Sequence, residues 1–136
     1  MTAEPKRSAR DTTRVTPPLR VLIVDDDPEI ARMLARSLSR RGFQIDCTRS
    51  ADEALAQAGK AAYDAAILDL VMPGRDGADL SAALRSRIPG LVIAFLTGYA
   101  NSPLVEQARR GGAAVFAKPV AVHEIVDFLE AQLGAS

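Results

Sequence analysis

Short apolar runs alternate with amphipathic segments along the chain from Leu19 onward. The runs are nearly continuous in apolar residues, which is typical of strands covered on both faces of a parallel sheet. In the intervening segments apolar residues recur every three or four positions, the spacing of one face of a helix. The predicted strands are LRVLIV, FQIDC, YDAAILDL, LVIAFLT and AAVFA.

The amphipathic segments also carry helix start and stop signals. The first predicted helix ends near Arg40 and Arg41, a basic last turn with Gly42 behind it. The second starts at Ser50, and the glutamate three residues later completes a capping-box pattern. The second helix is predicted to end at about residue 58. The third is predicted over about 78–87 and the fourth over about 102–110. The apolar faces of the first and last helices are Ile30, Met33, Leu34 and Leu38, and Val122, Ile125, Val126, Leu129 and Leu133.

Five strand–helix units in succession predict an α/β fold. Their alternation implies a five-stranded parallel sheet with helices on both faces, joined by right-handed crossovers. The common five-stranded order for this class, 2-1-3-4-5 as in the flavodoxin-like fold, has its switch point between strands 1 and 3. Ligands of such folds bind at that point, beyond the carboxyl ends of the strands.

Composition narrows the class of protein. The chain has 136 residues, enough for one domain with a real core. Its 17 basic and 17 acidic residues balance, so no overall field favours direct binding to nucleic acid or a membrane. Cys47 is the single cysteine, which excludes a disulfide framework, and we expect it in the core. Neither a signal peptide nor a membrane-spanning run is present, so a cytoplasmic protein is expected.

The two ends of the chain differ from its middle. Residues 1–18 are polar, mildly basic and without apolar periodicity, which predicts a disordered N-terminal tail. An alternative is a docking or targeting arm built on Lys6, Arg7, Arg10 and Arg14. The folded domain is predicted over 19–133, with 134–136 as the C-terminal end.

Three consecutive aspartates follow the first predicted strand, in VLIVDDDPE. Asp27 precedes a proline and is a good helix N-cap, so its role is structural. Asp25 and Asp26 end strand 1, and Asp69 ends strand 3, which is its neighbour in the predicted order. These carboxylates should converge, and Mg²⁺ is a natural counter-ion for a few carboxylates plus waters and a phosphate.

Two further polar residues end the later strands. Thr97 closes strand 4 with a hydroxyl, and Lys118 follows strand 5 with an ammonium group. Each is ordinary by itself. With carboxylates and Mg²⁺ they make a phosphoryl-transfer site, in which an aspartate can act as nucleophile and form an acyl phosphate.

The chain resembles the receiver domain of two-component response regulators, over about residues 19–133. The stretches VDDDP, LDLVMPGRDG, LTG and AKP stand in that family's order and at close to its spacing. The resemblance implies that Asp69 is the phosphoacceptor, and that Thr97 and Lys118 hold the phosphoryl oxygens. It implies Mg²⁺ bound by Asp26, Asp69 and the backbone carbonyl of Val71, with Asp25 acting mostly through water.

The resemblance also implies details of the backbone. The bond between Lys118 and Pro119 is often cis in this family. Met72, Pro73 and Gly77 match the loop after the acceptor, and Gly77 is expected to take a backbone angle that other residues avoid.

The sequence departs from the family pattern at two places. The family usually has an aromatic switch residue in strand 5, and that position is Val115 counted from the lysine or Phe116 counted from the preceding glycine. Val71 and Tyr99 stand two residues after Asp69 and Thr97, at positions that in this family flank the path of the hydrolytic water. We expect slow self-dephosphorylation, because neither side chain can orient that water well; Tyr99 as a mere rim residue is the alternative.

By resemblance, a histidine kinase or histidine phosphotransfer protein donates the phosphoryl group, and a downstream protein target reads the result. The domain is not expected to be an enzyme beyond its own phosphorylation and dephosphorylation. A non-phosphorylated interaction module is the alternative, although all five site residues are kept. His123 is expected as a surface helix residue. A homodimer through the last two helices stays open, as does the choice between a stand-alone regulator and a fragment of a longer one.

Overall fold

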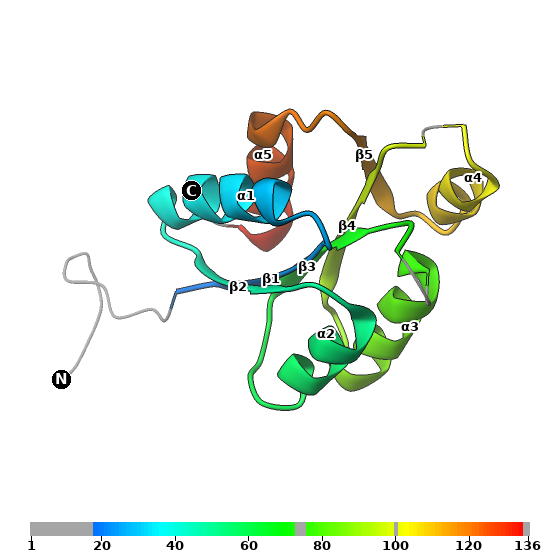
Figure 1. Cartoon of the computed structure of the whole chain (residues 1–136). Coiled ribbons are helices and arrows are strands. Elements are labelled where there is room, and N and C mark those ends of the chain that lie inside the picture. The colour runs from blue at the N-terminus through cyan, green and yellow to red at the C-terminus, as the bar shows by residue number, and fades with distance from the viewer. Residues whose placement is uncertain (1–17, 73–75, 100, 135–136) are drawn as a thin grey trace, which may run out of the picture.

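The computed structural model describes residues 18–72, 76–99 and 101–134. Strands and helices alternate throughout these residues (Figure 1). The strands are β1 (Arg20–Val24), β2 (Gln44–Thr48), β3 (Ala65–Asp69), β4 (Val92–Thr97) and β5 (Ala114–Ala117). The helices are α1 (Pro28–Arg40), α2 (Ala51–Ala58), α3 (Gly77–Arg87), α4 (Pro103–Arg110) and α5 (Val122–Leu133). The predicted tail and its basic residues fall in residues 1–17 and lie outside this description.

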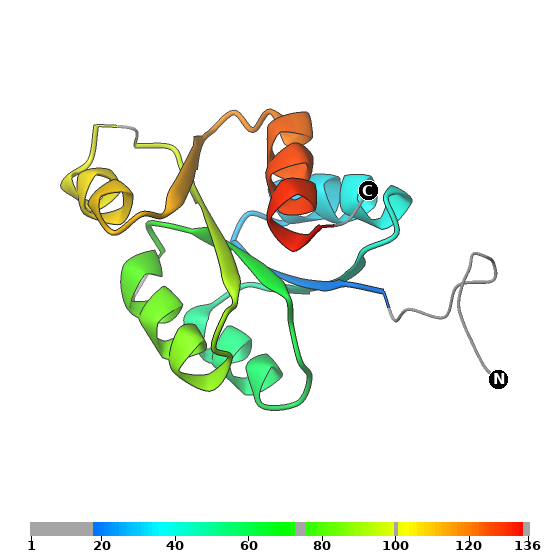
Figure 2. The same ribbon diagram turned by 180° about the vertical axis from the view of Figure 1, so that it is seen from behind.

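All five strands are parallel and form one sheet in the order β2-β1-β3-β4-β5, which confirms the predicted topology. Helices α1 and α5 cover one face, whereas α2 and α3 cover the other (Figures 1 and 2). Helix α4 lies at the β4–β5 end of the sheet, on the side of α3. The parallel arrangement brings the carboxyl ends of β1, β3, β4 and β5 to one edge, and this edge carries the candidate site.

Alternate residues of each central strand enter two separate apolar layers. Leu22 and Val24 of β1 belong to an apolar cluster that includes residues of α2, α3 and α4 together with Tyr63 and Phe95. Val21 and Ile23 pack against α1 and α5 on the other face. Both faces of β1 and β3 are therefore buried, which explains why these strands read as continuous apolar runs.

Local capping follows the sequence signals closely. The Ser50 side chain accepts a hydrogen bond from the Glu53 backbone at 3.2 Å, as the capping-box pattern predicts. The Glu53 carboxylate accepts from the backbone N–H of Arg49 at 3.0 Å instead of from that of Ser50. Gly42 adopts φ 92° just beyond α1, where the chain turns into β2.

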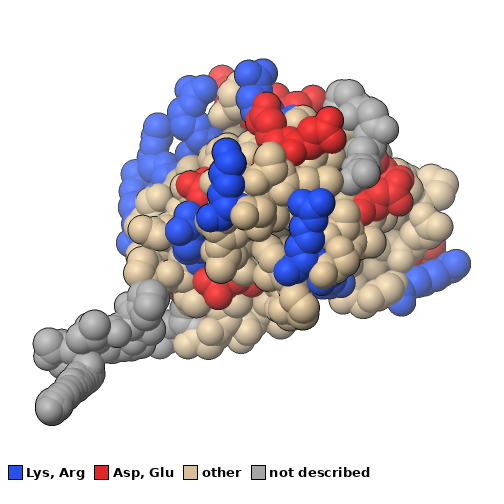
Figure 3. All heavy atoms as spheres, turned by 90° about the horizontal axis from the view of Figure 1, so that it is seen from below, with Lys and Arg blue, Asp and Glu red and all other residues tan. Residues whose placement is uncertain are grey.

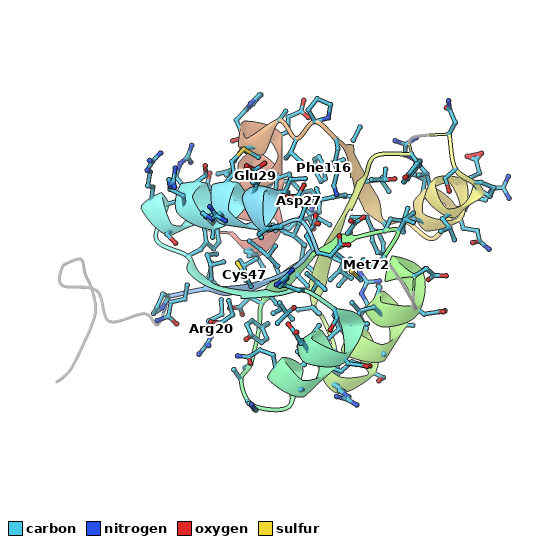
Figure 4. All side chains as sticks on the ribbon, in the orientation of Figure 1. Arg20, Asp27, Glu29, Cys47, Met72 and Phe116 are labelled. Atoms are coloured by element: carbon cyan, nitrogen blue, oxygen red, sulfur yellow. The ribbon has the colours of Figure 1, made fainter. Side chains whose placement is uncertain are left out.

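Two core predictions are wrong. Met33 is 39 % exposed, because the inward face of α1 is centred on Ala31, Leu34 and Leu38 and leaves Met33 toward solvent. Cys47 is exposed as well, because β2 is an edge strand and α1 covers only part of it (Figure 4). Partial burial against α1 still raises the pKa of the Cys47 thiol, and the nearby charge of Asp46 adds to this.

The surface carries charges of both signs. On the face seen from below, basic and acidic side chains are interspersed and no patch of one sign spans it (Figure 3). Within the described residues, no helix combines the length and the apolar composition that crossing a bilayer requires.

Candidate functional site

Each of the three consecutive aspartates has a different environment. Asp25 is 1 % exposed, and its Oδ1 accepts a hydrogen bond from the Asp27 backbone at 2.9 Å. Asp27 is the N-cap of α1: its Oδ1 accepts from the Glu29 backbone at 3.0 Å, at the first turn of the helix (Figure 4). Asp26 is exposed between them. The structural role predicted for Asp27 is confirmed.

Asp69 ends β3, the strand beside β1, and its side chain meets the two aspartates of β1. One oxygen from each of Asp25, Asp26 and Asp69 can be chosen so that all three lie within 4.8 Å of one another. Asp69 is only 6 % exposed, and its Oδ1 accepts a hydrogen bond from the Val71 backbone at 3.1 Å. The predicted convergence of these carboxylates is therefore present.

Lys118 forms ion pairs with two of the three carboxylates, those of Asp25 and Asp69. Its Nζ lies 3.1 Å from Oδ2 of Asp69 and 3.2 Å from Oδ2 of Asp25. The Lys118 backbone N–H donates to the Thr97 carbonyl at 2.8 Å, which fixes its position at the end of β5. The peptide bond that joins Lys118 to Pro119 is cis. We call Asp25, Asp26, Asp69 and Lys118 the carboxylate cluster.

The carboxylate cluster holds more negative than positive charge. Burial raises the pKa of Asp69; the hydrogen bond from Lys118 opposes this rise, and the charge of Asp25 adds to it. Burial alone would lower the pKa of Lys118. The hydrogen bond and charge of Asp69, together with the charge of Asp25, outweigh burial and raise it. One ammonium group therefore faces an excess of carboxylates, two of which are buried.

The unmet hydrogen-bonding capacity of this site fits a cation. Oδ2 of Asp25 is buried and has no hydrogen-bond partner among the described residues, although Lys118 lies within ion-pair distance. A buried carboxylate oxygen whose one described contact is an ammonium group shared with a second carboxylate is only partly compensated. Its neighbours are hard oxygen donors, the ligands that Mg²⁺ and Ca²⁺ take. The residues present therefore suit a divalent metal ion.

Thr97 ends β4 at the same edge of the sheet. It is 1 % exposed, and its Oγ1 accepts a hydrogen bond from the Tyr99 backbone at 2.9 Å. Tyr99 itself is 65 % exposed and Val71 is 39 % exposed. Both line an open hollow of about 600 Å³ beside the carboxylate cluster; its described lining is Val71, Gly98, Tyr99, Asn101, Ser102 and Leu104. The position of Val71 and Tyr99 near the site was predictable from their spacing after Asp69 and Thr97. That of Asn101, Ser102 and Leu104 was not, because the sequence shows only that they follow Thr97 closely.

Gly77 is required at its position, but the expected reason is wrong. Its backbone is not among the described positive-φ glycines. Instead, a Cβ on Gly77 would lie 2.7 Å from the Asp69 carbonyl oxygen and 2.8 Å from Cα of Leu70. Its N–H donates to the Leu70 carbonyl at 2.8 Å. The start of α3 thus packs directly on the backbone of the Asp69 segment. Met72 is buried beside it, and Pro73 lies outside the described residues.

Comparison with known proteins agrees with this geometry. The model of the response regulator receiver domain family matches residues 21–130. The chain belongs to this family.

Curated relatives of this chain include a response regulator receiver protein and a probable transcriptional regulatory protein. A response regulator receiver protein of Anaeromyxobacter is 41 % identical over 109 residues, covering 79 % of this chain and 46 % of the relative. The probable transcriptional regulatory protein TcrX of Mycobacterium tuberculosis is 33 % identical, covering 85 % and 50 %. The receiver domain therefore spans about half the length of these curated relatives.

Two solved structures show the same fold. A Burkholderia pseudomallei response regulator, crystallised with a phosphorylated aspartic acid and a calcium ion, is 36 % identical with a TM-score of 0.72, over 79 % of this chain and 64 % of that one. The chemotaxis protein CheY4 of Vibrio cholerae is 30 % identical with a TM-score of 0.74, over 84 % and 98 %.

The two candidates for the switch position of the receiver domain lie on opposite faces of the sheet. Val115 packs in the layer of α2, α3 and α4 together with Phe95. Thr97 lies two residues after Phe95 and so shares that face of β4. Phe116 packs on the α5 side (Figure 4). Its ring lies edge-on to that of Phe128, with 5.6 Å between the ring centroids. His123 is exposed on the first turn of α5.

Proposed function

We propose that this receiver domain is a phosphoacceptor switch in which Asp69 takes a phosphoryl group. The observation that carries the proposal is the carboxylate cluster itself: two buried aspartates share a single lysine, and a third, exposed aspartate lies close to both. Folding alone gives no reason for this excess of buried negative charge, because an apolar residue at either buried position would cost less. A phosphoryl-transfer site needs these groups together.

Asp69 is the nucleophile in this proposal. One carboxylate oxygen attacks the phosphorus of a phosphorylated histidine, the N–P bond breaks as the O–P bond forms, and the imidazole regains a proton from water. Lys118, already 3.1 Å from Oδ2 of Asp69, would hold a phosphoryl oxygen as a point charge. Thr97 would donate its hydroxyl to another, because the hydrogen bond from the Tyr99 backbone uses that hydroxyl only as acceptor.

Asp26, Asp69 and the carbonyl of Val71 would hold Mg²⁺, with Asp25 acting through water. When bound, Mg²⁺ would offset the negative charge that builds up on the phosphoryl oxygens. Two observations support the indirect role of Asp25: its Oδ1 is engaged by the Asp27 backbone, and its Oδ2 faces Lys118. The calcium ion and phosphorylated aspartic acid of the Burkholderia relative are consistent with this assignment.

The partners follow from the chemistry. A histidine kinase or a histidine phosphotransfer protein would supply the phosphoryl group, and a downstream protein would respond to the changed surface. Val115 is the better candidate for the switch position, because it shares the face of the sheet on which Thr97 lies. An aliphatic residue cannot swing between two ring positions, so the output of this domain would rely on a smaller rearrangement near Thr97.

The first test is the intact mass of the protein after incubation with Mg²⁺ and acetyl phosphate. We expect one added phosphoryl group, which disappears with EDTA and in Asp69→Asn. Asp64→Asn is the matched control, because Asp64 is an aspartate outside the site that accepts a hydrogen bond from the Arg20 backbone. No gain in a folded, Mg²⁺-binding protein would favour a non-phosphorylated interaction module.

Val71 and Tyr99 make slow self-dephosphorylation the expected behaviour. Both side chains line the hollow beside the site: Val71 has no polar group, and the bulky Tyr99 ring is expected to obstruct water that approaches in line with the O–P bond. Replacing Val71 by asparagine adds such a group, so Val71→Asn should shorten the phosphoryl half-life about tenfold. This is less than a positioned acid or base contributes, because an amide can orient water but cannot take its proton. The half-life is measured as the rate at which the added phosphoryl mass disappears. An unchanged half-life in Val71→Asn would reject this explanation.

A further inference from the structure

Helix α1 carries a straight row of arginines on its outer side. Arg32, Arg36 and Arg40 are four residues apart, so they lie one above the other, and all three are exposed. Among the described residues, none of them has an acidic side chain within ion-pair distance. Like charges at this spacing destabilise a helix by about 0.2–0.5 kcal/mol per pair. The row therefore costs stability in the isolated domain. We call it the α1 row.

Helix α5 carries the opposite charge. Glu124 and Asp127 are exposed and three residues apart on its outer side, away from the buried Ile125, Val126 and Leu129. We call these two acids the α5 row. Helices α1 and α5 lie side by side on the same face of the sheet (Figures 1 and 2). Apart from Glu29 in the first turn of α1, the outer surface of this helix pair thus has a basic half on α1 and an acidic half on α5.

The chain already pairs these two helices by charge once. Arg41, just beyond α1, donates to both carboxylate oxygens of Glu130 in α5 at 3.1 and 3.0 Å. That ion pair uses Glu130, the acid of α5 that turns toward α1, and leaves Glu124 and Asp127 without such a partner among the described residues. Both bonds come from one guanidinium nitrogen, so this is a single-nitrogen contact of a half-exposed arginine and not the stronger two-nitrogen fork.

We propose that the α1 and α5 rows bind a second copy of this chain. In a two-fold dimer the α1 row of one copy faces the α5 row of the other, and the symmetry makes the same contact twice. A second copy fits better than an unrelated acidic protein, because one chain supplies both halves of the charge pattern. The sequence has no net charge, so two copies do not repel each other as a whole. This surface differs from the last two helices, the pair for which the sequence leaves a homodimer open.

The composition of the surface sets the strength of this dimer. Met33 is the one large apolar side chain described as exposed on α1, and the described part of α5 has none. Exposed ion pairs contribute only about 0.2–1 kcal/mol each, so the dimer should be weak and governed by ionic strength. Such an interface suits reversible association and not a permanent oligomer.

The experiment is sedimentation equilibrium of the full chain at low and high salt. We expect concentration-dependent dimers at about 20 mM salt and association weaker by roughly tenfold or more at about 500 mM, where charges are screened within a few ångström. Asp69→Asn should dimerise like the wild type, so failure of the phosphoacceptor proposal and failure of this one are separable. A chain that stays monomeric at low salt over the accessible concentration range would overturn the proposal.

Charge reversal identifies the surface. Arg36→Glu and Asp127→Arg should each abolish self-association, because each places like charges opposite one another in both contacts. An equimolar mixture of the two variants should form heterodimers. In the mixed pair the introduced glutamate of one copy faces the introduced arginine of the other, and the second contact is the native one.

A matched control separates this surface from a general effect of charge. Arg110→Glu, the same change at an exposed residue of α4, should leave the dimer intact. A mixture of the two reversal variants that stays monomeric, although both are folded by circular dichroism, would overturn the assignment. Disruption by Arg110→Glu equal to that by Arg36→Glu would overturn it as well.

Discussion

Two polar clusters lie toward opposite ends of β1, and each combines a lysine or arginine with carboxylates. Near its start, Asp46 accepts hydrogen bonds from the Tyr63 hydroxyl at 2.6 Å and from Arg20 at 3.0 Å, with the guanidinium 5.4 Å from the centre of the Tyr63 ring. We call these three residues the Tyr63 cluster. Beyond the other end of β1, the carboxylate cluster sets one lysine against three aspartates.

The pKa values of the carboxyl groups of Asp46 and Asp69 move in opposite directions. The hydrogen bond from Tyr63 lowers the pKa of Asp46, against the effect of burial, and the bond and charge of Arg20 lower it further. Burial raises the pKa of Asp69 in spite of Lys118. One carboxylate with two good donors is a satisfied structural element, whereas several carboxylates around one donor leave capacity for a ligand. The number of donors per carboxylate, more than the residue types, separates a structural cluster from a chemical one.

The largest expected effect comes from removing the only cation of the carboxylate cluster. Lys118→Met leaves Asp25 and Asp69 as buried neighbouring carboxylates, so we expect a loss of about 3 kcal/mol in the free energy of unfolding without Mg²⁺. Added Mg²⁺ should restore part of that loss. Urea denaturation with and without Mg²⁺ measures both quantities. Lys60→Met, at an exposed lysine, is the control, and an equal effect of the two variants would contradict the comparison.

The consecutive aspartates offer the next test, because their roles should separate. Mg²⁺ at about 100 times its Kd should stabilise the wild type by about 2.7 kcal/mol. Asp26→Asn should remove most of that gain and leave the metal-free stability nearly unchanged, since Asp26 is exposed. Asp27→Ala should do the reverse: it removes the N-cap of α1, costs about 1 kcal/mol, and keeps the response to Mg²⁺. Thermal melts over a Mg²⁺ titration distinguish the two patterns.

The convergence of the site was predictable because it depends on topology. Strand–helix alternation fixes a parallel sheet, and the order of the sheet brings residues at the ends of β1 and β3 together whatever their side-chain conformations. Asp69 and Lys118 are 49 residues apart, yet each could be assigned to this edge from its place after an apolar run. Asp27 was predictable for a local reason, the proline that follows it.

What the sequence could not provide depends on packing between elements. Cys47 is apolar enough for a core, but only the sheet order makes β2 an edge strand. A glycine in a loop suggests an unusual backbone angle, whereas the actual constraint on Gly77 is the backbone of Asp69 and Leu70 beside it. The face on which Val115 lies follows from the register of β5 with β4. Counting along the sequence alone leaves two candidates for that position.

Gly77 tests whether the backbone is packed more tightly beside the carboxylate cluster than elsewhere in the domain. An added Cβ would meet backbone atoms at 2.7 and 2.8 Å, so Gly77→Ala must displace the Asp69 segment or the start of α3. We expect a loss of about 2 kcal/mol in stability and slower phosphorylation of Asp69. Gly59, at the end of α2, has ordinary helical angles, and its nearest atom would be 3.5 Å away. Gly59→Ala should be neutral or slightly stabilising in urea denaturation, with unchanged phosphorylation. Equal tolerance of both alanines would show that the site edge is no tighter than the rest.

The smallest effect is expected in the Tyr63 cluster, and it concerns pH. The pKa of Asp46 is lowered in the folded state, so its stabilising contribution is complete above the ordinary aspartate pKa and disappears as pH falls through the lowered value. Tyr63→Phe removes the largest cause of that lowering. We expect a loss of about 1 kcal/mol at pH 7, because Asp46 stays partly hydrated, and a smaller loss at pH 3, where the carboxyl is more protonated. Urea denaturation at both pH values measures this difference. Phosphorylation of Asp69 should be unaffected, since the Tyr63 cluster shares no residue with the carboxylate cluster. An equal loss in the free energy of unfolding at both pH values would mean that the hydroxyl acts through packing and not through the charge of Asp46.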